Sequence, residues 1–289
     1  TSRPVLAAFA FLTVGVSLKL ALIPLHVWLP GAYAHGPSVA TAFLAGTATK
    51  VAIYVLIRFI FSVFGGAISF HSLPVSEVLL VLSVAAMFIA SILAVFENDV
   101  KRVLAYSSLG QIGYITLGIA LANVSGLTGG IVHLFNHALM KTALFMSLGA
   151  IVYRIGTVRL QDLAGIGRQM PMTMTVFVIG GLALVGVPGT AGFVSKWYLA
   201  VGAFERGWWP LVFLILVTSL IAVVYVGRGV EVAWLREPSE FAASAKDPPW
   251  SMLMPMLALA AATIYFGIDT EASATIARRA AEVLVGGLK

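Results

Sequence analysis

Three basic side chains recur at a spacing of four residues within an otherwise apolar stretch. They are His133, His137 and Lys141. At 3.6 residues per turn, this spacing places all three on one face of a helix, each about 6 Å further along its axis. A neutral imidazole offers both a donor and an acceptor nitrogen, and a desolvated amine releases its proton more readily than one in water. A lone histidine on such a face is usually a satisfied core residue, but this series in register predicts a proton relay.

Further basic residues lie within other apolar segments: Lys19, His26, Lys50 and Lys196. A lysine near the middle of a bilayer costs about 2.5–3.5 kcal/mol, and its amine reaches the lipid headgroups only when it lies near a helix end. Reaching the headgroups is a weak explanation for Lys50, because this lysine lies far from both ends of its apolar segment. We therefore expect Lys19, Lys50 and Lys196 to join the relay. No carboxylate lies within the apolar segments, so an acidic partner is expected from residues before Thr1 or from a neighbouring subunit.

The composition is that of a membrane protein with several spans. Of the 289 residues, 60% are hydrophobic and 10% charged, whereas a soluble domain carries about 25% charged residues. The mean hydropathy is +0.99. Long continuous apolar runs, unlike the alternating pattern of a β-barrel, predict an all-α bundle of about eight transmembrane helices. The expected spans cover 5–29, 38–62, 76–96, 102–122, 127–153, 171–203, 208–235 and 250–268.

Two of these spans are expected to be discontinuous. The first carries Lys19 and then Pro24 and His26, and the sixth carries Pro188 and then Lys196. Proline removes a backbone donor, and non-helical backbone at membrane depth persists only where protein or a wet cavity surrounds it. A packed kink is the simpler alternative. Paired broken spans, each beside a lysine, instead indicate a transporter with repeated halves.

Loop charges predict the orientation. The loops expected at 30–37, 97–101, 154–170 and 236–249, with the adjoining helix ends, hold most of the basic residues. By the positive-inside rule this side is cytoplasmic, and both termini lie on the non-cytoplasmic side. Residues 1–268 form a single transmembrane domain, followed by a short outer tail at 269–289. The tail is expected to be a surface helix or a frayed end, with an apolar stripe of Ile276, Ala280, Val283 and Leu284.

Five stretches, in order, resemble the antiporter-like membrane subunits of respiratory complex I, Mrp-type sodium/proton antiporters and membrane-bound hydrogenases. They are Lys19–Pro30, Lys50 with Tyr54 and Arg58, Asn98–Ser108 with Gln111–Tyr114, His133–Lys141, and Gly186–Lys196. The resemblance implies the second half of a fourteen-helix fold. On that map 5–62 is a remnant of the first inverted repeat, 76–235 is the second repeat, and 250–268 is the last span.

The resemblance also implies roles for single residues. Lys19 matches the central lysine of the first broken helix, Lys50 the connecting lysine, and Lys196 the terminal lysine. His133, His137 and Lys141 match the polar axis between the half-channels. The stretches 155–163 and 192–196 are most similar to the Mrp D-type subunit.

These observations lead to one expected function and two alternatives. We expect a proton-translocating subunit of a multisubunit cation/proton antiporter or an NADH-quinone oxidoreductase-like complex in a bacterial inner membrane. Its partners would be other membrane subunits, lipid, protons and Na+, with no nucleic acid. No cofactor or metal is expected, because cysteine is absent and no dinucleotide fingerprint occurs, so any redox centre would lie in another subunit. Whether the chain belongs to an enzyme complex stays open.

One alternative is a haem or metal protein using His26, His133 and His137. It is disfavoured because two histidines on one helix face cannot both ligate the two sides of a single haem. The other alternative is a structural subunit that has lost transport.

Overall fold

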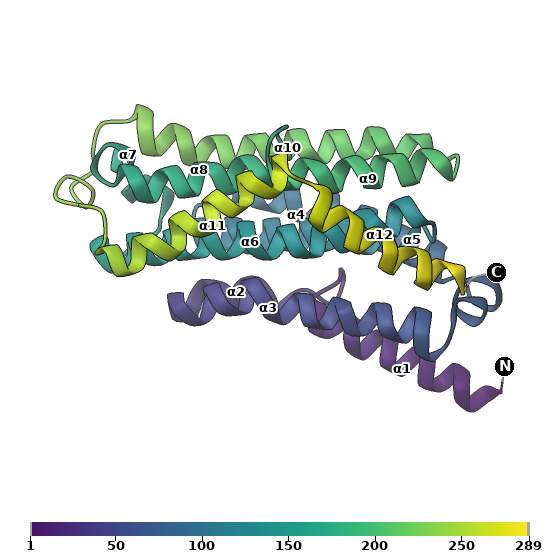
Figure 1. Cartoon of the computed structure of the whole chain (residues 1–289). Coiled ribbons are helices and arrows are strands. Elements are labelled where there is room, and N and C mark those ends of the chain that lie inside the picture. The colour runs from purple at the N-terminus through teal and green to yellow at the C-terminus, as the bar shows by residue number, and fades with distance from the viewer. Residues whose placement is uncertain (1, 288–289) are drawn as a thin grey trace.

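The structure, a computed structural model, describes residues 2–287, and its regular elements there are helices (Figure 1). Within that range seven helices are long and apolar enough to cross a membrane. They are α1 (Arg3–Leu20), α3 continuing into η1 (Ser38–Val63), α4 (Val75–Phe96), α5 (Val100–Ala120), α6 (Val124–Ile155), α10 (Trp209–Leu235) and α11 (Trp250–Ile268). An eighth crossing is divided between α8 (Pro171–Val185) and α9 (Ala191–Glu205). The expected all-helical bundle is confirmed.

Both expected helix breaks occur, and both begin before the proline. Helix α1 ends at Leu20, where Ala21 adopts a left-handed conformation with φ of 61°. Helix α8 ends at Val185, where Gly186 has φ of 86°. In each case the left-handed residue redirects the last backbone hydrogen bonds, and proline follows within three residues because it cannot continue the helix. The two broken spans thus share one local cause.

The segment expected as a loop at 30–37 is mostly helical. Helix α2 (Trp28–His35) packs against α5, with Leu29 and Tyr33 buried. The indole nitrogen of Trp28 donates to the carbonyl oxygen of Leu18 at 2.9 Å, which ties α2 to the end of α1. This segment is helical because it buries apolar residues against α5. It follows the break after α1 and forms the second half of the first broken span.

The connecting segments are short helical turns. Two π-helical turns, η1 (Arg58–Val63) and η2 (Ala67–Ser72), lead from α3 to α4. A 3-10 turn, η3 (Leu160–Leu163), and α7 (Ile166–Gln169) lead from α6 to α8. In Figure 1 both ends of the described chain lie at the same end of the bundle, and α7 lies at the opposite end.

The tail forms helix α12 (Glu271–Gly286), which packs along α6. It buries Ala274, Ala277 and Ala281, whereas Ile276 and Val283 of the expected stripe are 71% and 78% exposed. Alanines therefore form the face of α12 that packs on α6, because their small side chains allow a close approach, and Ile276 and Val283 of the expected stripe lie outside this face. Leu284 and Val285, near the end of the helix, are half-buried against the core.

Helix α6 lies at the centre of the bundle and contacts α3, α5, α8, α9, α11 and α12. Its packing on α5 depends on small residues. A Cβ atom added at Gly118 would lie 2.6 Å from the carbonyl oxygen of Gly126 and 2.7 Å from Cα of Gly130. Such small-residue contacts let transmembrane helices approach closely. The helix that carries the predicted relay is consequently in contact with six other helices, and its close neighbour α5 is almost fully buried.

Candidate functional site

The predicted face of α6 points into protein. His133, His137 and Lys141 are each 0% exposed. The imidazole rings of the two histidines stack, with centroids 6.0 Å apart and an angle of 7° between the ring planes. The helical period therefore predicted the relation between these side chains correctly, and the surrounding helices supply their partners.

His133 is held at both ring nitrogens. Its Nε2 lies 2.9 Å from Oε1 of Gln111 on α5, and its Nδ1 lies 2.6 Å from Oγ of Ser195 on α9. The ring of Tyr114 packs beside it at 5.6 Å between centroids. Contacts from two helices besides its own thus fix the orientation of this imidazole.

His137 differs from its neighbour. Among the described residues, neither of its ring nitrogens has a hydrogen-bond partner. Next to it, Asn136 donates from Nδ2 to the carbonyl oxygen of Ala191 at 2.7 Å, at the start of α9. Buried imidazole nitrogens usually have a hydrogen-bond partner, so His137 contrasts with His133, whose two ring nitrogens are both paired.

Lys141 and Lys50 are buried amines that donate to main-chain oxygens. The amine of Lys141 donates to the carbonyl oxygen of Leu104 at 2.8 Å and to the hydroxyl of Ser107. Lys50, on α3, is 6% exposed and donates to the carbonyl oxygen of Ala45. Helix α3 packs along α6, so Lys50 lies on a direct neighbour of the helix that carries both histidines.

Lys196 extends from α9 back across the break in its span. Its amine donates to the carbonyl oxygens of Leu184 and Val185 at 3.0 and 2.9 Å, and to Oγ of Ser219 at 2.8 Å. These three bonds use all the donors of an ammonium group. The two carbonyls belong to the last turn of α8, where the helix dipole is negative and favours a cation. The broken span thereby provides a binding place for the amine.

The ring of Tyr114 joins Lys196 to the histidines. The amine of Lys196 lies 4.6 Å from the centre of this ring, in cation–π geometry. The hydroxyl of Tyr114 lies 2.6 Å from Oγ1 of Thr218 on α10. One aromatic side chain therefore contacts both His133 and Lys196.

The structure does not bring every predicted residue into this group. Lys19 is exposed in the last turn of α1. His26 is half-buried, with Nδ1 3.3 Å from the carbonyl oxygen of Pro24, and Pro188 is exposed in the break between α8 and α9. The two prolines mark the breaks, and Lys19 faces away from the group around α6.

Sequence reasoning missed the polar partners of the relay. These partners are Ser107, Gln111, Tyr114, Ser195 and Ser219. Their signal was a set of serine, glutamine and tyrosine residues within otherwise apolar spans. Buried polar groups need hydrogen-bond partners, so such residues are candidates to contact the titratable groups.

No carboxylate of residues 2–287 forms an ion pair with the buried lysines. Ion pairs within this range involve arginines instead: Arg102 with Glu97, Arg236 with Glu231, and Arg278 with Glu282. All three lie where the side chains remain partly exposed. Carbonyl and hydroxyl oxygens take the place of acids around the relay.

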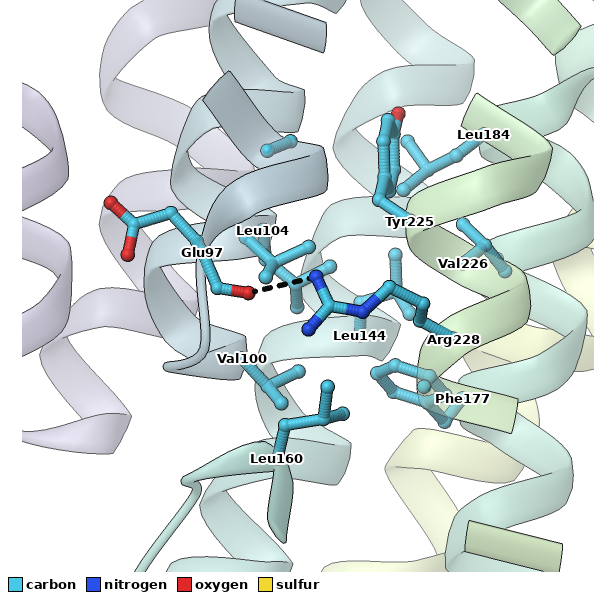
Figure 2. Close-up of a pocket in the computed structure, with 14 residues that line it drawn as sticks. Glu97, Val100, Leu104, Leu144, Leu160, Phe177, Leu184, Tyr225, Val226 and Arg228 are labelled. Atoms are coloured by element: carbon cyan, nitrogen blue, oxygen red, sulfur yellow. Dashed lines mark hydrogen bonds between the residues drawn. The ribbon is translucent and has the colours of Figure 1, made fainter. Parts of the chain in front are cut away.

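An arginine and a layer of apolar side chains separate the relay from one end of the bundle. Figure 2 shows Arg228 of α10 reaching toward the main-chain carbonyl of Glu97, among apolar residues that include Leu104 and Phe177. Arg228 also donates to Oδ1 of Asn98 at 3.0 Å. Beyond it lies a polar cleft of about 740 Å³, which is rich in charged residues. Lys141 bonds to the carbonyl of Leu104, so this apolar layer stands between the cleft and the relay.

Proteins of known name match most of this chain. Subunit N of NADH-quinone oxidoreductase from Desulforudis audaxviator (strain MP104C) is 39% identical, over 93% of this chain and 56% of the relative. Subunit N of F(420)H(2) dehydrogenase from Methanosarcina mazei is 32% identical, over 99% of this chain and 59% of the relative. The chain thus spans less than two thirds of the length of these relatives. Both are N subunits, so the expected D-type identity is not matched among them.

Solved structures share the fold. The Mrp complex from Dietzia sp. DQ12-45-1b contains a chain with a TM-score of 0.90 and 27% identity, covering 98% of this chain and 60% of that one. Respiratory complex I from Thermus thermophilus, with 23% identity, shows the same fold with a TM-score of 0.86, covering 97% of this chain and 58% of that one. The family model described as NADH:quinone oxidoreductase/Mrp antiporter, TM, matches residues 2–222. The chain therefore belongs to the NADH:quinone oxidoreductase/Mrp antiporter transmembrane family.

Proposed function

We propose that this chain relays protons within the membrane part of a multisubunit respiratory or antiporter complex. The observation that carries the proposal is the enclosed group of basic side chains around α6, in which Lys141 and Lys196 each donate to carbonyl and hydroxyl oxygens. Such partners accept a hydrogen bond from either the ammonium or the neutral amine. These amines can therefore gain and lose a proton without losing their position.

The proposed route uses Lys19, Lys50, His133, His137, Lys141 and Lys196, connected by water. His133 and His137 stack on each other, and Tyr114 lies between His133 and Lys196. In this route Lys19 receives or delivers protons at the first broken span, outside the enclosed group. Na+ is the further ion proposed to be exchanged for protons if the assembly is of the antiporter type.

The likeness to the named relatives supports an N-type subunit. Relatives from Desulforudis and Methanosarcina are named as subunits of NADH-quinone oxidoreductase and F(420)H(2) dehydrogenase. We place the chain in a bacterial inner membrane among lipid and other membrane subunits, with both termini on the non-cytoplasmic side. We assign it to the second half of the family fold, with 5–62 from the first repeat, 76–235 forming the second repeat, and 250–268 as the last span.

The test is substitution of the relay lysines in the assembled complex. Lys196→Ala and Lys50→Ala are expected to abolish ion pumping in inverted membrane vesicles while native gels show normal assembly. Lys246→Ala is the matched control, because this lysine is exposed in the loop before α11. Wild-type flux in both relay variants would contradict the proposal. Lost assembly with unchanged flux per complex would favour the purely structural alternative.

A further inference from the structure

The hydrogen bonds around His133 suit two protonation states of the same ring. Gln111 presents Oε1 to Nε2 at 2.9 Å, and Ser195 presents Oγ to Nδ1 at 2.6 Å. Oγ of Ser195 also lies 3.0 Å from the carbonyl oxygen of Gly192, to which it can donate. The hydroxyl proton therefore has two places to point, the imidazole or the main chain.

Each orientation of this hydroxyl satisfies one charge state of the ring. In the neutral ring, Nε2–H donates to Gln111 and the Ser195 hydroxyl donates to Nδ1. In the imidazolium both nitrogens are donors. The Ser195 hydroxyl then turns to the Gly192 carbonyl, and its oxygen accepts from Nδ1–H. The two sets differ in the direction of the Ser195 O–H, and both ring nitrogens keep a hydrogen bond in each.

We propose that Gln111 and Ser195 are positioning residues that let His133 take up and release a proton without moving its ring. This inference deepens the proposed function and rests on it. In the transfer, the hydroxyl proton of Ser195 passes to Nδ1 as its oxygen takes one proton from a hydrated proton in the relay, and this new hydroxyl proton points to the Gly192 carbonyl. The imidazole gains one proton and the water loses one, so atoms and charge balance.

The charges that face His133 come from several helices. Lys196 of α9 and Lys50 of α3 act on it electrostatically, His137 stacks on it from α6, and Tyr114 packs beside it from α5. A buried imidazolium is costly unless hydrogen-bond acceptors surround it, so a site that solvates the charged ring without rearrangement is needed to keep that state accessible. Gln111 and Ser195 contribute the two acceptor oxygens for it.

The first test replaces the rotating hydroxyl. In vesicles holding the assembled complex, Ser195→Ala is expected to slow proton pumping by about tenfold, because one buried ring nitrogen loses its partner in both states. Ser147→Ala is the matched control. Ser147 is a buried serine on α6 whose hydroxyl donates to the Leu144 carbonyl at 2.7 Å, as Ser195 does to Gly192. Equal pumping in these two variants would overturn the inference.

The second test measures the pH profile of pumping, which would not shift if Gln111 had a purely structural role. Gln111→Glu places a carboxylate against Nε2, which favours the imidazolium. The midpoint of the pH profile of pumping is then expected to move toward alkaline pH by about one pH unit. An unchanged profile, or a shift toward acid, would overturn the positioning role of Gln111.

His133→Ala separates failure of this inference from failure of the proposed function. Loss of pumping in His133→Ala, together with normal pumping in Ser195→Ala, would reject only the positioning role. Normal pumping in His133→Ala would remove this histidine from the route and reject the inference and that part of the proposed function together.

Discussion

Gly192 is the residue at which α9 comes closest to α8, and its replacement by alanine tests whether the two half-helices must touch. A Cβ atom at this position would lie 1.8 Å from the carbonyl oxygen of Ala183. Carbon and oxygen need about 3.3 Å between them, so the half-helices would have to separate by about 1.5 Å. The obstructing atom belongs to the backbone, and a change of side-chain rotamer cannot relieve the clash.

Separating the half-helices would also move Lys196 away from its hydrogen-bond acceptors on α8. Its bonds to the carbonyl oxygens of Leu184 and Val185 are 3.0 and 2.9 Å long, and an added 1.5 Å would break both. Hydrogen bonds of a charged donor contribute about 1.5–3 kcal/mol each, and alanine regains up to about 1 kcal/mol of helix propensity. We therefore expect Gly192→Ala to destabilise the broken span by about 2–5 kcal/mol.

The assay compares variants of the assembled complex. Thermal unfolding of the purified complex and proton pumping in vesicles should both decline for Gly192→Ala. The matched control is Gly227→Ala on α10, where an added Cβ meets nothing within 4 Å. If Gly192→Ala unfolds and pumps like Gly227→Ala, the close contact between α8 and α9 does not position Lys196, and our reasoning about the break is wrong.

Three further predictions concern the elements around the relay. Asp247→Ala removes the carboxylate that accepts from Thr173 N at 2.9 Å at the start of α8; we expect a loss of about 1–2 kcal/mol, seen as a lower thermal midpoint with pumping retained. Tyr114→Phe keeps the ring over Lys196 and should pump nearly normally, whereas Tyr114→Leu also removes a cation–π contact of about 0.5–2 kcal/mol and should slow pumping several-fold. Gly118→Val would force α5 away from α6, and native gels should show little assembled complex.

The sequence predicted the features of this fold that depend on local chemistry. Apolar runs of sufficient length identified the spans, and the prolines at 24 and 188 located both breaks. The helical period placed His133, His137 and Lys141 on one buried face. Each of these features follows from residues close together in the chain, so single-sequence reasoning could find them.

Features that depend on tertiary contact were not predictable in the same way. The orientation of Lys19 depends on which side of α1 meets other helices, and Ile276 is exposed because alanines of α12 pack on α6 instead. Gln111 and Ser195 contact His133 although they lie 22 and 62 residues from it in the chain, on other helices. No periodic pattern within one segment predicts such contacts between helices.

The oxygens around the buried lysines explain how basic groups persist here without acids among the described residues. A carboxylate beside Lys196 would favour the charged amine and hold its proton. The carbonyls at the end of α8 carry only the partial negative charge of a helix terminus, so they orient the amine while stabilising its charge less strongly. A proton carrier has to release its proton as well as bind it. Breaking a transmembrane helix beside a lysine meets both requirements, because it exposes main-chain acceptors at membrane depth and adds no ion pair that must be separated in each cycle.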